Sequence, residues 1–342
     1  MARILYGVMG DSRGHLSRSL AVAGELSRHE IVFAGGGLVG TVGEQGYRSI
    51  PLPMLGTVLR NGAVDTMGTL VNTARELLRQ GQTLTRLRRE MEVFKPDLVI
   101  TDYEYFTPLA ARQLGLPCLS IDHQHVVTHT RYQTPPGQGW NRLCTSLPIR
   151  YLFSNAQRFL VSSFFAPPVA DPARVELFGP VLRPQPLKYT ASAGDHVLVY
   201  LRGASLKAVV NLLDGRARRY VIYGFGEGTA TANCVFKKPS VEGFLEDLTS
   251  AAAVLSNGGH SLLSESFHFG KPVCCVPTGM FYEQYLNAWF VEQLGYGLLM
   301  PDIARGEILD DFESRIPTFA AALAGKSFHG NAALAARVES LL

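Results

Sequence analysis

Chemistry-bearing residues gather in the C-terminal half of the sequence, where a glycine turn precedes a predicted helix. An apolar strand runs into Asn257, Gly258 and Gly259, and the helix is predicted to begin at His260 and Ser261. Glycines let the backbone approach a ligand closely, and a helix N-terminus offers N–H groups and a positive dipole end. The pattern therefore predicts a site for phosphate oxygens that needs no metal ion.

Three further side chains are candidates for the same site. Glu265 lies within the first two turns of the predicted helix, where a carboxylate can accept hydrogen bonds from a ribose diol. Tyr223 ends another strand of this half, and Phe236 is placed to wall a nucleotide base. The alternative for Glu265 is a solvated helix carboxylate.

The N-terminal half has its own candidate, a histidine at the start of a helix. The first predicted strand, Arg3–Val8, leads into a glycine-containing loop that ends at Gly14 and His15. A positive dipole end favours a neutral imidazole, and a neutral imidazole can take a proton. The alternative is a histidine that caps or packs the first turn.

The glycine spacing of this first loop does not fit the GxGxxG motif, so a nicotinamide-dependent dehydrogenase is disfavoured.

The elements that must position these residues alternate between short apolar strands and helices. This order predicts an α/β protein with parallel sheets covered on both faces. Pro180, Pro184 and Pro186 lie close together at the start of the segment 181–194, and the strand–helix pattern then begins again. We therefore expect two Rossmann-like domains with a cleft between them: an N-terminal domain over 1–180, a linker over 181–194 and a C-terminal domain over 195–325. Residues 326–342 are expected to form a C-terminal helix that packs back on the N-terminal domain.

The amino-acid composition and the net charge limit the classes of protein to which the chain can belong. The 342 residues are 46% hydrophobic and 18% charged, which is typical of globular domains. The net charge of +3 gives no support to nucleic-acid binding. The five cysteines are scattered with no CxxC, as in a reduced cytoplasmic protein. Because the N-terminus reads as a strand and no apolar run is long enough to span a bilayer, we expect a cytoplasmic location.

The C-terminal stretch resembles the donor-binding signature of GT-B glycosyltransferases, in particular those of the family 1 and family 28 type. The resemblance covers more than thirty residues with matching internal spacing. It is carried by Gly258, Gly259, Ser261, Glu265, Gly270-Lys271-Pro272, Pro277, Glu283-Gln284 and Asn287-Ala288.

The resemblance implies roles for these residues in holding a nucleotide-sugar donor. The turn backbone and Ser261 would hold the diphosphate, Glu265 the ribose, and Glu283 and Gln284 the hydroxyls of the donor sugar. The alternative for Gln284 is a surface amide. Asn257 departs from the pattern, because many family 1 members have a phosphate-contacting histidine there. This departure leaves the donor sugar unassigned.

The first loop of the chain also resembles that of GT-B enzymes, in which Gly-His opens a helix containing Ser-Arg. In many inverting members this histidine is the general base, so the resemblance assigns that role to His15. Asp102 ends a predicted strand at a position where family 1 members often have an Asp that orients the histidine. Such a carboxylate fixes the tautomer of the imidazole and stabilises its charged form. The alternative for Asp102 is a cap on the following helix.

Residues near these two are candidates for contacting the acceptor, namely Asp11, Gly14, Glu104 and His125. Glu104 and Asp122 are also alternative bases if Asp102 points away. His125 belongs to an HxHxxxH run with His123 and His129, which lacks a carboxylate or Cys partner at metal-site spacing. We therefore expect no metal and no cofactor, with acceptor contacts or structural hydrogen bonds favoured for this run.

Residues 54–91 mix apolar positions with several arginines, including Arg75 and Arg79. Such a surface could meet a lipid-linked or anionic acceptor and touch the inner face of a membrane. The alternative is a solvated helix face.

These observations predict a glycosyltransferase that uses a nucleotide-sugar, with UDP favoured over dTDP, and transfers the sugar with inversion to a hydroxyl acceptor. Two alternatives remain. One is a GT-B nucleotide-sugar 2-epimerase that needs no acceptor, and the other is a non-catalytic protein that binds nucleotide-sugars. The acceptor itself is set by variable loops and is not predicted.

Overall fold

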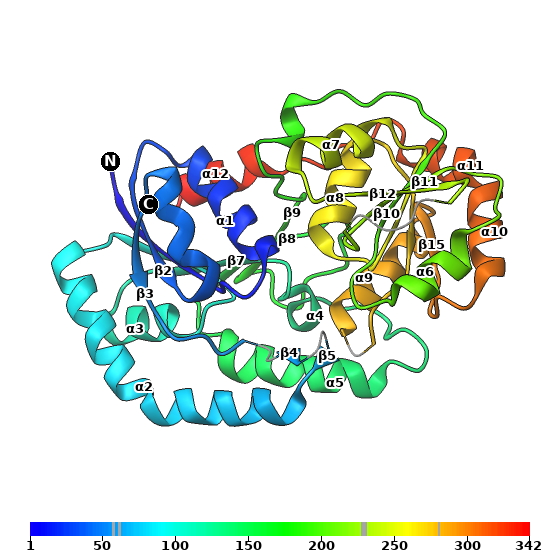
Figure 1. The fold of residues 1–342 in the computed structure, drawn as a ribbon. Helices are drawn as coiled ribbons and strands as arrows, with labels where there is room; N and C mark the ends of the chain where they lie inside the picture. Colours follow the sequence, from blue (N-terminus) through cyan, green and yellow to red (C-terminus); the bar gives the residue numbers. More distant parts are fainter. Residues whose placement is uncertain (57–58, 61–62, 227–230, 280) are drawn as a thin grey trace. The chain divides into compact units, whose positions relative to one another are not determined.

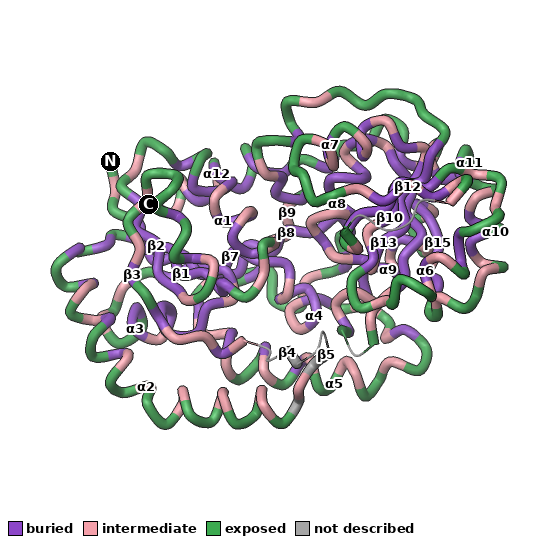
Figure 2. Tube along the Cα trace, in the orientation of Figure 1, coloured by how far each residue is buried: buried purple, intermediate pink, exposed green. Residues whose placement is uncertain are grey.

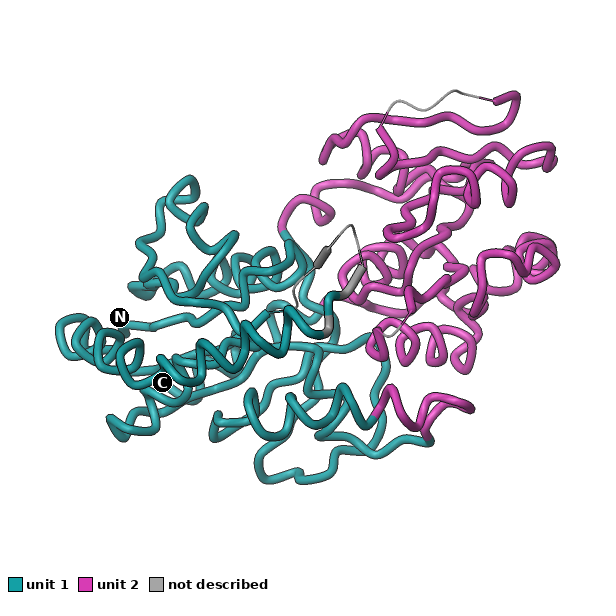
Figure 3. The backbone as a smooth tube through the Cα atoms, turned by 60° about the horizontal axis from the view of Figure 1, so that its bottom comes forward, with its two compact units in different colours: residues 1–133, 143–183, 330–342 teal, residues 134–142, 184–329 magenta. Residues whose placement is uncertain are grey.

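The computed structural model describes residues 1–56, 59–60, 63–226, 231–279 and 281–342. Part of the arginine-containing segment 54–91, residues 57–58 and 61–62, lies outside the described residues. The chain forms two compact units (Figure 3). Unit 1 comprises Met1–Gln133, Leu143–Arg183 and Gly330–Leu342, and unit 2 comprises Thr134–Arg142 and Pro184–His329.

Unit 1 is built on a parallel sheet with the strand order β3-β2-β1-β6-β7-β8-β9 (Figure 1). Its strands are β1 (Arg3–Val8), β2 (Glu30–Gly35), β3 (Arg48–Pro51), β6 (Leu98–Asp102), β7 (Cys118–Asp122), β8 (Arg158–Ser162) and β9 (Val175–Phe178). The central strands are buried along almost their whole length, as Figure 2 shows, because helices cover both faces of the sheet. Neighbouring strands therefore end at one carboxyl edge, where Val8 of β1 pairs with Asp102 of β6.

The helices of unit 1 follow the strands in alternation. They are α1 (Arg13–Glu25), the 3-10 helix η1 (Gly37–Gln45), α2 (Thr66–Phe94), α3 (Phe106–Leu114), α4 (Val126–His129), α5 (Gly139–Pro148), the π-helix η2 (Ile149–Phe153) and α12 (Asn331–Glu339). The first residues of α5 are grouped with unit 2 and the rest with unit 1. A small antiparallel pair, β4 (Leu59–Arg60) and β5 (Ala63–Val64), precedes α2.

The C-terminal helix α12 is part of unit 1. Its apolar residues Leu334, Ala335 and Val338 join the core cluster that fills the space between the sheet and α1. At its start, the Asn331 amide exchanges two hydrogen bonds with the backbone of Leu182, at 2.9 and 2.8 Å. The chain end therefore stabilises unit 1, although it follows unit 2 in sequence.

Unit 2 is also built on a parallel sheet, with the strand order β12-β11-β10-β13-β14-β15. Its strands are β10 (Val197–Tyr200), β11 (Tyr220–Tyr223), β12 (Cys234–Lys237), β13 (Ala253–Ser256), β14 (Val273–Cys275) and β15 (Gly297–Leu299). Its helical elements are the 3-10 turn η3 (Pro186–Lys188), α6 (Leu206–Leu213), α7 (Val241–Ser250), α8 (His260–His268), α9 (Tyr282–Gln293), α10 (Gly306–Ser314) and α11 (Ile316–Leu323).

The α/β class and the two parallel sheets predicted from the sequence are confirmed. The chain passes from unit 1 to unit 2 between Arg183 and Pro184, within the proline-rich segment 181–194. Five short strands, β3, β4, β5, β12 and β15, were not predicted from the sequence. Over the described residues, no helix has both the length and the apolar character that a membrane-spanning segment requires.

Candidate active site

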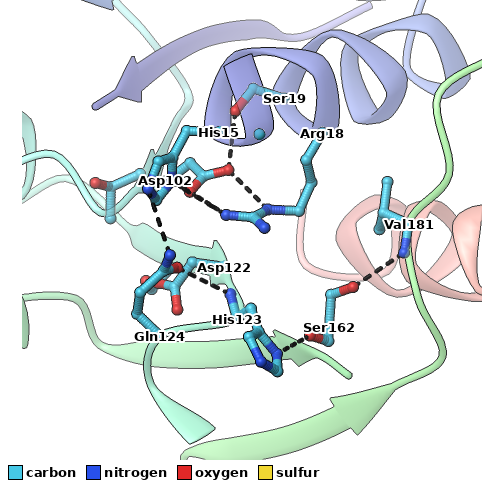
Figure 4. Close-up of polar contacts among 12 residues, drawn as sticks. His15, Arg18, Ser19, Asp102, Asp122, His123, Gln124, Ser162 and Val181 are labelled. Carbon is cyan, nitrogen blue, oxygen red and sulfur yellow. Dashed lines mark hydrogen bonds and ion pairs between the residues drawn. The ribbon is translucent and has the colours of Figure 1, made fainter. Parts of the chain in front are cut away.

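The carboxyl edge of the unit 1 sheet brings His15 and Asp102 together (Figure 4). Asp102 is the last residue of β6 and is fully buried, while His15 lies in the first turn of α1, which follows β1 directly. The His15 Nδ1 atom lies 2.7 Å from an Asp102 carboxylate oxygen. Asp102 therefore does not point away, so neither Glu104 nor Asp122 is needed as a substitute for it.

The same carboxylate also binds an arginine that the sequence analysis gave no role. Arg18 donates from Nε and Nη2 to the two Asp102 oxygens, at 2.9 and 2.6 Å, and is itself buried. Ser19 donates a further hydrogen bond at 3.1 Å. Arg18 lies one helical turn after His15, so the spacing that places both on one face of α1 was a usable signal.

The charge on Asp102 corrects the expectation that the helix dipole keeps His15 neutral. Burial lowers the pKa of His15, but the Asp102 charge and its hydrogen bond raise that pKa by more, and the net shift is upward from 6.5. Arg18 opposes this shift, because its guanidinium charge lowers the pKa of the imidazole. The carboxylate thus increases the basicity of His15 and the arginine limits the increase.

The far nitrogen of His15 faces a side chain from the next strand end. Because the Nδ1–H group of His15 donates to Asp102, Nε2 is the nitrogen that can accept a further proton. The Gln124 side-chain nitrogen, in the loop after β7, lies 3.3 Å from it. The Tyr103 ring stacks on the imidazole at a centroid distance of 5.9 Å and on Phe153 at 4.1 Å. The imidazole is therefore held in one orientation, with Nε2 directed away from Asp102.

His125 is not placed to contact an acceptor, and this corrects the expectation for it. It is fully buried, and its Nδ1 atom lies 2.6 Å from an oxygen of Asp122, at the end of β7. Its Nε2 atom lies 3.2 Å from the Ser154 hydroxyl. Burial alone would raise the pKa of Asp122, but the charge and hydrogen bond of His125 hold it well below the usual range. The Asp122–His125 pair, with the contact to Ser154, stabilises the loop between β7 and η2.

The other histidines of the run have separate partners. His123 Nδ1 lies 2.9 Å from the carbonyl oxygen of Ser162, and His129 lies beside Thr128. Burial and the neighbouring His125 lower the pKa of His129 to about 3. In the part of the chain that the structure describes, no three His, Cys, Asp or Glu side chains are grouped as metal ligands.

The remaining acceptor candidates of unit 1 fall into two kinds. The Glu104 carboxylate is buried and accepts from the backbone N–H groups of Phe106 and Thr107, at 2.9 and 2.6 Å. It therefore caps α3, the task considered for Asp102, and burial raises its pKa. Asp11 is exposed in the loop after β1, and Gly14 is partly exposed at the start of α1. Asp11 and Gly14 thus stay accessible, whereas Glu104 does not.

In unit 2 the predicted glycine turn follows β13 at the carboxyl edge of the sheet. Gly258 has φ +82°, and a Cβ atom there would lie 2.8 Å from the Gln284 carbonyl oxygen. The position therefore requires glycine for both its conformation and its contact with α9. The buried Asn287 amide donates to the Gly258 carbonyl at 3.0 Å. The Asn-Ala pair of the sequence motif thus fixes the turn.

Asn257 is used within the protein. Its oxygen accepts from the Arg202 backbone N–H at 2.6 Å, and its nitrogen donates to the Val276 carbonyl at 3.0 Å. These contacts tie together the ends of β10, β13 and β14. The departure from the family pattern at this position therefore has a structural role.

The start of α8 lies directly after this turn. Gly259 precedes the first helical residue, and a Cβ atom on it would meet nothing within 4 Å, so space is open above its backbone. His260 and Glu265 are buried, whereas Ser261 is partly exposed. Backbone N–H groups of a first turn have no partner within the helix and are suited to an anion.

The side chains assigned to the donor sugar lie in the first turn of α9. Glu283 and Gln284 are both partly exposed. The Gln284 oxygen accepts from the Thr278 backbone N–H at 3.0 Å, so its amide nitrogen is the part directed to other partners.

The two aromatic candidates of unit 2 are revised. Phe236 is a buried member of the hydrophobic core, so it has no face for a nucleotide base. Tyr223 is also buried, and its hydroxyl donates to Asp247 at 2.6 Å. Lys237 pairs with the same carboxylate at 2.8 Å. These contacts are internal to unit 2.

Comparison with known proteins relates the chain to glycosyltransferases. A family model described as "Glycosyl transferase family 1" matches residues 2–317. An uncharacterized glycosyltransferase of Methanosarcina acetivorans is 28% identical over 327 residues, which cover 87% of this chain and 85% of that protein. One of Methanosarcina mazei is 25% identical and covers 90% and 88% of the two chains.

Solved structures share the fold over the whole chain. The glycotransferase of kitacinnamycin superposes with a TM-score of 0.73 at 21% identity, covering 100% of this chain and 99% of that one. The glycosyltransferase VinC, in complex with dTDP, has a TM-score of 0.67 at 17% identity and covers 99% of each chain. MurG of Acinetobacter baumannii has a TM-score of 0.67 at 15% identity, also covering 99% of each. The expected GT-B fold is thereby confirmed.

Proposed function

Because the chain belongs to glycosyl transferase family 1 and is a glycosyltransferase, we propose that it transfers a sugar from a nucleotide-sugar to a hydroxyl by direct displacement with inversion. The observation that carries this proposal is the hydrogen bond of 2.7 Å between His15 and the buried Asp102. It supplies an oriented imidazole with raised basicity at the edge of the unit 1 sheet. Such a group is suited to general-base catalysis.

In the proposed step, the acceptor hydroxyl gives its proton to His15 Nε2 while its oxygen attacks the anomeric carbon of the donor. The bond from that carbon to the nucleoside diphosphate breaks, and the diphosphate leaves with the electron pair. The imidazolium that forms is stabilised by the Asp102 carboxylate, which Arg18 and Ser19 also bind. Attack from the face opposite the leaving group inverts the anomeric configuration.

Unit 2 is proposed to bind the donor. The first turn of α8, with Gly259, His260 and Ser261, would stabilise the charge that develops on the leaving diphosphate. Glu265 would accept from the ribose, and Glu283 and Gln284 would contact the sugar. The open space at Gly259 and the partial exposure of Ser261 support this assignment. We propose a UDP-sugar, with a dTDP-sugar as the variant to test.

The acceptor is proposed to bind to unit 1 near Asp11 and Gly14, the accessible members of its candidate set. A lipid-linked hydroxyl acceptor at the inner membrane face would suit the exposed arginines Arg75 and Arg79 of α2. We therefore propose a cytoplasmic enzyme that contacts this membrane peripherally.

A donor panel tests the proposal. UDP- and dTDP-sugars would be incubated with hydroxyl acceptors in the presence of EDTA, and the anomeric configuration of donor and product would be read by NMR. The expected result is an inverted product in wild-type protein and none in His15→Ala. A retained configuration would refute direct displacement. Formation of a 2-epimer without an acceptor would instead indicate the alternative epimerase reaction.

A further inference from the structure

Helix α5 and the π-helix η2 carry an exposed apolar row, which we name the α5 row. It consists of Trp140, Leu143, Leu147 and Tyr151, whose exposed fractions are 71, 48, 46 and 77%. Their spacing of three, four and four residues keeps them on one face of a helix. Apolar side chains of this size are seldom presented in a row to water without a partner.

The opposite face of these helices is packed into unit 1. Ser146, Ile149 and Phe153 are buried, and the Phe153 ring stacks on Tyr103 at 4.1 Å. Because the opposite face of the helices is packed in this way, the side chains of the α5 row point towards solvent. The row is not the core side of a loosely attached helix.

The segment of sequence that carries the α5 row has charges of one sign. The sequence from His123 to Ala170 contains no Asp or Glu, although it contains Arg131, Arg142, Arg150 and Arg158. Arg150 is exposed and directly precedes Tyr151. A partner that covers the row would therefore meet arginine and no carboxylate from this segment, which favours a negatively charged partner.

Helix α2 of unit 1 has a second row of the same character. Met67, Leu70, Val71 and Leu78 are exposed, between 52 and 88%, at positions that share one helix face. Arg75 and Arg79 are exposed beside them. Two helices of one chain thus combine exposed apolar side chains with arginine.

We propose that the exposed face of α5 and η2 docks on the surface of a bilayer that contains anionic lipid. Leu143 and Leu147 enter the boundary between headgroups and acyl chains, while Trp140 and Tyr151 lie at the headgroup level that their amphipathic rings prefer. Arg150 contacts the lipid phosphates. Docking specifies the membrane contact proposed above and does not depend on the proposed sugar transfer; only its purpose, bringing the enzyme to a lipid-linked acceptor, rests on that transfer.

Vesicle binding tests the proposal with full-length protein and no substrate. Sedimentation would compare vesicles of phosphatidylcholine alone with vesicles that also contain phosphatidylglycerol. We expect binding only to the anionic vesicles, at least about tenfold weaker binding for Leu143→Ser/Leu147→Ser, and about fivefold weaker binding for Arg150→Gln. Brominated lipid should quench the fluorescence of Trp140, a loss of signal that Trp140→Phe removes.

The matched control is Leu206→Ser/Val241→Ser, which removes two apolar side chains, each 41% exposed, from other helices. This control should bind vesicles as the wild type does. Equal binding to neutral vesicles, equal loss in both double variants, or no vesicle binding would overturn the proposal. So would a dimer in solution that Leu143→Ser/Leu147→Ser dissociates, because the row would then be covered by a second copy. Sugar transfer to a water-soluble acceptor is measured separately, so loss of docking and loss of catalysis are distinguishable.

Discussion

Replacing Asp102 with Asn removes one charge from the centre of the unit 1 site while nearly preserving its shape. In the native site this carboxylate accepts from His15, twice from Arg18, and from Ser19, at distances between 2.6 and 3.1 Å. An amide has one oxygen, so whichever way it turns, its NH₂ group faces donors. The buried Arg18 then loses its ionic partner.

The magnitude follows from the burial of this pair. Removing one member of a buried ion pair costs about 3–5 kcal/mol, because the other charge stays in a low-dielectric environment. The hydrogen bonds to Asp102 belong to the same interaction and are not counted again. Because a native domain is stable by about 5–15 kcal/mol, we expect Asp102→Asn to fold with a strongly reduced free energy of unfolding. For activity, loss of the oriented base lowers kcat/KM by about 10²–10⁴-fold.

Urea unfolding and transfer kinetics measure the two effects on the same preparation. Ser19→Ala is the matched control, because it removes only the hydroxyl bond of 3.1 Å to the same carboxylate. It should lower the free energy of unfolding by about 1 kcal/mol and leave kcat/KM nearly unchanged. A folded Asp102→Asn enzyme with kcat/KM within about threefold of the wild type would show that Asp102 does not orient the base.

Three further predictions concern pH, the donor turn and metals. The pKa of His15 is raised above 6.5, and only the neutral imidazole accepts a proton. We therefore expect kcat/KM to fall as the pH drops through a value above 6.5. A pH of half-maximal kcat/KM below 6.5 would contradict this. Gly258→Ala should lower the melting temperature, because the φ of +82° and the nearby Gln284 carbonyl both disfavour a side chain. Nucleotide affinity, measured by calorimetry, should weaken by at least about tenfold. Unchanged affinity would show that the turn is not part of the donor site. EDTA should leave transfer unchanged when the product is measured directly by chromatography, and strict dependence on Mg²⁺ or Mn²⁺ would argue against a diphosphate held by α8 alone.

The fold was predictable because its strands are short, apolar and separated by helices. The first strand, Arg3–Val8, was predicted with the bounds it has. The strands that were missed have two to four residues, as in β15 (Gly297–Leu299), and are too short for a period to emerge. The assignment of 134–142 to unit 2 could not be predicted, because contacts between distant segments leave no local pattern.

The candidate site was predictable where a residue type stood at a strand end or a helix start. His15 and Asp102 satisfy that rule, and the structure brings them within hydrogen-bonding distance. The spacing places Arg18 on the same helix face as His15, but its burial depends on the position of β6 and could not be predicted. The same limit explains Phe236 and His125, which are buried by packing that the sequence does not reveal.

Single-turnover sugar transfer by His15→Gln at saturating donor measures how much the His15 imidazole contributes to the transfer step. The substitution removes the proton-accepting nitrogen in unit 1 and leaves the donor turn of unit 2 untouched, so affinity for UDP or dTDP, measured on the same protein, is the internal control. We predict unchanged nucleotide affinity and a transfer rate lower by at least about 10²-fold. A transfer rate within about threefold of the wild type, at unchanged affinity, would contradict the role of His15 as the base.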